Sequence, residues 1–214
     1  MVYAFVIHTL NPSAGDDVCR MLYTCTFGTE DAPDDALQQP VTIGGDLSDS
    51  KQEIDHRTFK KEQLALVARQ VQSEYSFRKS VVTKDPWEQG TSMHSIGGIA
   101  DDASQSEIGM FRLAAGDPFQ AEKISVWLGL ANVAFTLVCE KSENRLLAEG
   151  VLKLLSRYLQ EHVQAVTQPA EVLTRGDRVA IIVHQFLPGG RLLFMNYAVI
   201  RQLERDLENL LRGK

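Results

Sequence analysis

The stretch VYAFVIHTL, residues 2–10, constrains the fold more than any other part of the sequence. It is rich in β-branched and aromatic residues and is continuously apolar up to His8. Such a run predicts a central strand that is buried on both faces. Residues 20–27 (RMLYTCTF) follow a turn cluster and alternate between two faces, so the two segments predict a β-hairpin. A sheet built around this strand must be covered on both sides.

The spacing of apolar residues predicts the remaining elements. Strands are expected at 107–115, 123–130 and 133–140, and helices at 60–77, 145–163, 177–187 and 196–214. Asp177 is expected to cap the third of these helices. Two strands, a helix, three strands and then helices predict an α+β domain with a five-stranded antiparallel sheet packed between helices.

The chain is expected to form one domain over residues 1–214, with flexible insertions at about 28–57 and 79–105. The first insertion is acidic and contains several prolines and glycines, and the second is polar. Both lack the apolar area that would offset the entropy of ordering, which predicts surface segments outside the packed core.

Charge and cysteine content exclude several classes of protein. The net charge of −6 and the pI of about 5.4 argue against direct contact with nucleic acid, which needs a basic face. The three cysteines contain no CxxC pair, so neither a disulfide framework nor a zinc site is expected. The apolar start is too short to cross a membrane and lacks the basic flank of a signal peptide. We therefore expect a cytosolic protein that meets membranes only through a partner.

The sequence offers no recognisable site for catalysis or for a cofactor. The five histidines share no metal-binding spacing, and the strings GxSxG and GKS/T are absent. Gly189 and Gly190 follow a predicted helix, whereas phosphate-binding glycines precede one, so this pair predicts a chain reversal. We expect no enzyme, no metal and no cofactor.

Two features suggest binding to another protein. The apolar stripe of the helix at 145–163 is wide enough to be contacted on more than one side, either by the core alone or by another subunit as well. Trp127 lies on the strand face opposite Ile124 and Val126, where it is either core or contact surface. The candidate interface residues are Leu152, Leu154, Leu155, Leu159 and Trp127.

The stretches VYAFVIHTL and HQFLPGG, together with residues 125–163, resemble the small (sigma) subunits of heterotetrameric adaptor protein complexes. CRMLYTCTFG, FRLAAGDPFQ and FLPGGRLLFMN are similar to those of the fifth adaptor complex. The resemblance covers most of the chain outside the two insertions. It implies a longin-like fold and a structural subunit without enzymatic activity.

The resemblance also implies partners and a place in the cell. A sigma subunit of this kind packs against the trunk of a large subunit, here a zeta chain, beside a beta chain and a mu chain. The fifth complex is associated with spatacsin and spastizin rather than with clathrin. These partners imply a cytosolic protein, peripheral on late endosomes and lysosomes, that takes part in retrieval towards the Golgi. The family's link to DNA repair allows for a nuclear pool.

Clathrin-type sigma subunits help to bind acidic dileucine signals through an apolar pocket and a nearby base. By resemblance, the strand position of this pocket falls near Val133. The base falls within residues 16–22, where Cys19 takes its place and Arg20 is adjacent. Asp16 and Asp17 would repel an acidic signal. Val133 and Arg20 therefore mark a vestigial cargo pocket.

Two other interpretations stay open. The chain could be a free-standing longin-type module that binds a SNARE or a small GTPase, although a membrane SNARE would continue beyond Lys214 into heptads and an anchor. An enzyme with an unfamiliar site would need a deep pocket lined by His8 and by acids with perturbed pKa values.

Overall fold

The computed structural model describes residues 1–10, 19–28, 49–82 and 106–212. Its five strands form one antiparallel sheet in the order β2-β1-β5-β4-β3. They are β1 (Val2–Thr9), β2 (Met21–Thr26), β3 (Ser106–Leu113), β4 (Lys123–Leu130) and β5 (Val133–Glu140). The predicted α+β architecture with a five-stranded antiparallel sheet is confirmed, and it agrees with the longin-like fold.

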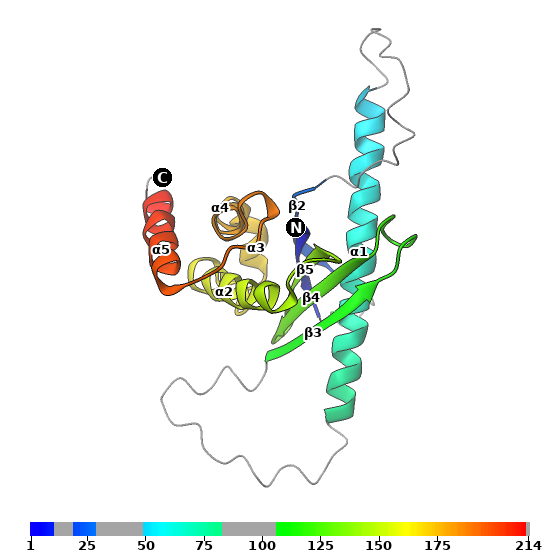
Figure 1. Ribbon diagram of the computed structural model, residues 1–214, viewed down its shortest axis with the longest axis horizontal. Coiled ribbons are helices and arrows are strands. Elements are labelled where there is room, and N and C mark those ends of the chain that lie inside the picture. The colour runs from blue at the N-terminus through cyan, green and yellow to red at the C-terminus, as the bar shows by residue number, and fades with distance from the viewer. Residues whose placement is uncertain (11–18, 29–48, 83–105, 213–214) are drawn as a thin grey trace.

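Helices cover both faces of the sheet (Figure 1). They are α1 (Asp49–Val82), α2 (Arg145–Val163), α3 (Ala170–Thr174), α4 (Gly176–Phe186) and α5 (Tyr197–Arg212). The long helix α1 crosses one face and extends beyond the sheet, and α2 packs on the other face. The next layer is α4, which contacts α2, and α5 lies outside α4.

The pairing of β1 with β5 joins the first hairpin to the three-strand meander. Phe5 lies opposite Leu137 across this pair, and Ile7 lies opposite Phe135. Every residue of β1 from position 2 to position 8 is buried, as the apolar run predicts. The strand therefore contributes to two separate cores, one on each side of the sheet.

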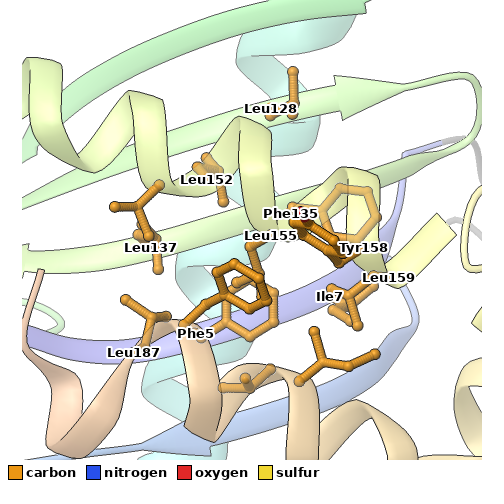
Figure 2. Packing of buried hydrophobic residues seen from close by; sticks show 14 of the residues in the cluster. Phe5, Ile7, Leu128, Phe135, Leu137, Leu152, Leu155, Tyr158, Leu159 and Leu187 are labelled. Carbon is orange, nitrogen blue, oxygen red and sulfur yellow. The ribbon is translucent and has the colours of Figure 1, made fainter. Parts of the chain in front are cut away.

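Each core joins the sheet to one helical layer. On the α2 side, Phe5 of β1 and Phe135 of β5 meet Leu155 of α2 (Figure 2). On the α1 side, Val6 and Trp127 pack with a stripe of α1. The α1 stripe consists of Leu64, Val67, Val71 and Tyr75. These positions recur at helical spacing, so the amphipathic pattern predicted for this helix is confirmed.

The helix α1 is longer than its apolar pattern indicates. It includes residues 49–57 and 79–82, which the sequence analysis assigns to the two insertions. An apolar stripe is needed only where a helix packs against the sheet. The parts of α1 that extend past the sheet therefore lack the sequence pattern by which a helix is predicted. The rest of both insertions lies outside the described residues, and the single-domain organisation stays a prediction.

The reversal predicted at Gly189 and Gly190 is present, and both residues have positive φ, of 57° and 74°. A Cβ at residue 190 would lie 2.5 Å from the Cβ of Phe27 and 2.6 Å from the carbonyl oxygen of Val2. Glycine is therefore needed here for backbone conformation and for close packing against the sheet. Asp177 lies in the first turn of α4, whereas Arg175 occupies the N-cap without a side-chain bond, so the capping prediction is wrong.

Replacing Gly109 by alanine should destabilise the protein. Gly109 lies opposite Trp127 on the neighbouring strand, and an added Cβ would come within 2.4 Å of the indole ring. Overpacking a rigid ring should lower the free energy of unfolding by about 1–3 kcal/mol, measured by urea denaturation. Gly109→Ala combined with Trp127→Leu should recover part of the loss. Simple addition of the two single effects would contradict this account.

Candidate partner-binding surface

Trp127 belongs to the core and not to an outer surface. Its side chain is wholly buried beneath α1. Tyr75 meets the indole edge-on, with ring centroids 6.2 Å apart, and the guanidinium of Arg78 lies 5.2 Å from the ring centroid. Of the two interpretations of Trp127, the one that places it in the core is confirmed, and the prediction that it lies at an interface is wrong.

Three of the four candidate leucines of α2 are also core residues. Leu152, Leu155 and Leu159 have no exposed surface, and Figure 2 shows them among the side chains of the sheet. The stripe is wide because the sheet covers one flank of α2 and α4 covers another. The structure thus corrects the interface prediction at these positions. Leu154 alone among the four is partly exposed.

A groove with apolar walls lies between α2 and the chain that enters α5. It is lined by Leu146, Leu147, Gly150 and Leu154 on the α2 side and by Phe194 and Ile200 on the other side. We call it the α2–α5 groove. Its volume is about 220 Å³. The Leu146 side chain is 80% exposed and that of Phe194 is 77% exposed, so two large apolar groups line the groove in contact with water.

Charged residues precede or follow several groove residues of α2 and α5 in the sequence. Glu149 is paired with Lys153 at 2.7 Å. Among the described residues, Arg145, which precedes the groove residue Leu146, has no carboxylate partner. Arg201, which follows Ile200, lines a separate hollow on α5 together with Glu204 and Glu208.

The residues of the predicted cargo pocket lie at one end of the sheet. Thr9 pairs with Val133, and its hydroxyl accepts the backbone N–H of Arg20 at 3.0 Å. The Val133 side chain is wholly buried, whereas Arg20 is exposed. A hollow of about 370 Å³, bounded by Ala131 and Gln160, lies beside the β4–β5 turn that precedes Val133. Val133 and Arg20 thus both neighbour Thr9, and the cargo pocket stays a prediction.

A buried polar chain links Cys19, His8 and Thr136. The Cys19 sulfur lies 3.2 Å from Nδ1 of His8, and Nε2 of His8 lies 3.2 Å from the Thr136 hydroxyl. Burial raises the pKa of the Cys19 thiol to about 11 and lowers the pKa of His8 to about 4. A nucleophilic cysteine needs a thiolate, so this neutral pair supports the core and has no activated group. His8 lines neither hollow.

The described residues, 1–10, 19–28, 49–82 and 106–212, bear on two of the expected absences. Within these ranges, no three histidine, cysteine, aspartate or glutamate side chains are placed to hold a metal ion. In the same part of the chain, no helix has the length and apolar character needed to cross a membrane. The expectation of no cofactor stays a prediction.

The layered fold agrees with the class of protein that the resemblance implies. An antiparallel five-stranded sheet between α1 and the layer of α2 and α4 is the longin-like architecture of adaptor small subunits, as the resemblance implies. A sequence model of the family described as AP-5 complex subunit sigma-1 matches residues 1–208.

Two relatives agree with this match. The chain is 38% identical over 215 residues to AP-5 complex subunit sigma-1 of Homo sapiens, an alignment that covers 96% of each chain. It is 39% identical over 173 residues to AP-5 complex subunit sigma-1 of Mus musculus, covering 78% of this chain and 91% of the relative. The chain therefore belongs to the AP-5 complex subunit sigma-1 family.

Aspartate substitutions should separate core leucines of α2 from surface leucines. Leu155→Asp buries an unpaired charge and should lower the free energy of unfolding by more than about 4 kcal/mol. Leu146→Asp places the same charge in water and should change the free energy of unfolding by less than about 0.5 kcal/mol. Thermal melts followed by circular dichroism measure both. A similar loss for the two variants would contradict these assignments.

The buried imidazole of His8 should make stability depend on pH. Its folded pKa of about 4 lies below the ordinary value of 6.5, so between these values the unfolded chain binds a proton that the folded chain rejects. The free energy of unfolding should therefore fall by about 3 kcal/mol as the pH drops from 6.5 to 4. Urea denaturation across this range should show a shallower fall for His8→Gln. Equal slopes for the two proteins would refute this source of the pH dependence.

Proposed function

We propose that the protein is the small structural subunit of a heterotetrameric adaptor complex that acts in endosomal and lysosomal membrane traffic. The family match over residues 1–208 carries this proposal, because the two relatives are named as sigma-1 subunits of the AP-5 complex. The similarity to the human relative covers 96% of this chain, so the whole domain and not a fragment of it supports the assignment. The role is assembly and not catalysis.

The proposed partners are a large zeta-type chain, a large beta-type chain and a medium mu-type chain. The protein packs against a large subunit through apolar side chains that its own fold leaves in water. Leu146 and Phe194, both more than three-quarters exposed, support such a contact, since groups of this size are normally buried in a stable interface. Spatacsin and spastizin are proposed as further partners of the assembled complex.

The proposed location is the cytosol and the outer surface of late endosomes and lysosomes. Membrane contact comes through the other subunits of the complex. A vestigial pocket at Val133 and Arg20 would leave cargo selection to those subunits. The net negative charge of the chain also supports this indirect contact, because anionic membrane surfaces repel a negatively charged protein.

Co-expression tests the assembly directly. The chain should co-purify with zeta, beta and mu subunits as a complex of one copy each, measured by size-exclusion chromatography with light scattering. The small subunit of a clathrin-type adaptor, expressed with the same three partners, is the matched control and should stay outside the complex. A stable monomer that binds none of the three would refute the proposal. Selective binding to a SNARE or a small GTPase would favour a free-standing longin module.

A further inference from the structure

No contact among the described residues of this chain requires a glycine at position 150, in the middle of α2. Gly150 is exposed on the α2–α5 groove, and a Cβ built on it would have no heavy atom within 4 Å. Its backbone is helical, so positive φ does not require glycine. A glycine inside a helix costs about 0.5–1 kcal/mol relative to alanine. A partner that approaches the α2 backbone closely would account for the glycine, because any side chain there would fill the groove.

Arg145 is a second residue that lowers the intrinsic stability of α2. It is the first residue of α2, and the first turn contains no acidic residue. The positive end of a helix dipole favours carboxylates and disfavours an arginine. Since Glu149 is already paired with Lys153, Arg145 can pair with a carboxylate from outside the chain. Arg201 of α5 faces a different hollow, where its guanidinium lies 4.8 Å from the ring centroid of Tyr197.

The shape and bonding of the groove favour a helical occupant. Its α2 wall presents side chains from a helix whose middle backbone groups are bonded within the helix. An extended peptide would find few partners there for its own N–H and C=O groups, whereas a helix satisfies them internally. A cavity of about 150 Å³ can hold one benzene ring. The groove, at about 220 Å³, therefore has room for one or two aliphatic side chains.

We propose that the α2–α5 groove binds an amphipathic helix of another protein, with aliphatic side chains at i and i+3 or i+4 and carboxylates beside them. The aliphatic groups pack over Gly150 between Leu146 and Phe194, and a carboxylate pairs with Arg145. A second copy of this chain fits less well, because a twofold contact would bring Arg145 of each copy to the same interface. The inference adds to the proposed function, which assigns Leu146 and Phe194 to a contact with a large subunit, by stating the chemistry of the helix that the groove binds.

A display library of helical peptides tests this chemistry. Each peptide carries varied apolar residues at i, i+3, i+4 and i+7, with the flanking positions varied among glutamate, lysine and serine. Selection on the full chain should enrich leucine, isoleucine or methionine together with flanking glutamate. The enriched peptides should bind in solution by fluorescence anisotropy and lose affinity as salt is added. No enrichment, or enrichment of lysine flanks, would overturn the proposal.

Matched variants locate the binding site. Gly150→Leu and Leu146→Asp should each weaken binding of the enriched peptide by at least about tenfold. Leu173→Asp is the control, because Leu173 is 58% exposed on α3 and does not line the groove, and it should leave affinity unchanged. Arg145→Ser should reduce both the affinity and its dependence on salt. Binding that survives Gly150→Leu, or that Leu173→Asp weakens equally, would place the peptide elsewhere.

Gly150→Ala gives a readout that separates binding from folding. Alanine should raise the melting temperature of the free chain, because it favours the helix and meets no neighbour. The same change should weaken peptide binding, because it narrows the floor of the groove. A variant that is less stable, or that binds as tightly as the original chain, would contradict the role given to Gly150. Sedimentation that shows a dimer disrupted by Gly150→Leu would instead assign the groove to a second copy.

These outcomes are independent of the adaptor assembly. If co-expression with the zeta, beta and mu subunits fails but the acidic helical peptide binds at Gly150, the proposed function fails and the groove inference stands. If the complex assembles equally well with Gly150→Leu and the library yields no acidic helix, the groove inference fails and the proposed function stands.

Discussion

The structure depends on burying both faces of one five-stranded sheet. β1 has no exposed residue between positions 2 and 8, and its side chains alternate between two cores. One face requires α1 and the other requires α2, which is covered in turn by α4. With the central strands enclosed on both sides, the outward surfaces of the helices are left for recognition. This arrangement is consistent with the proposed role of a subunit that assembles with others.

Much of the fold could be predicted because strand and helix periodicities reflect burial directly. The continuous apolar run at 2–10 identified the central strand, and Trp127 was correctly placed on the face opposite Val126. The extra turns of α1 were missed because a helix that extends past its support carries no apolar stripe. The N-cap of α4 was assigned to the wrong residue, since a short α3 ends immediately before α4 and Asp177 lies two residues after the N-cap residue Arg175.

The candidate site was less predictable, for a physical reason. A wide apolar stripe has the same sequence pattern whether a helix of the same chain or another protein covers it. Leu152 and Leu155 are wholly buried in the core, whereas Leu146, which precedes the stripe, is exposed to water. Two signals were visible in the sequence without being interpreted: a glycine inside a strongly helical segment, and an arginine where a helix start favours an acid. Both concern the free energy of the isolated helix, and they are a groove residue, Gly150, and the neighbour of one, Arg145.

The pairing of Phe5 with Leu137 has a consequence for biosynthesis. A ribosome that adds about 5–20 residues per second needs on the order of 10 seconds to reach β5 after it has made β1. During that interval the open edge of β1 has no strand to pair with, and the face that α2 covers in the folded protein is exposed. The nascent chain should therefore bind chaperones that shield apolar segments until about the last third of translation.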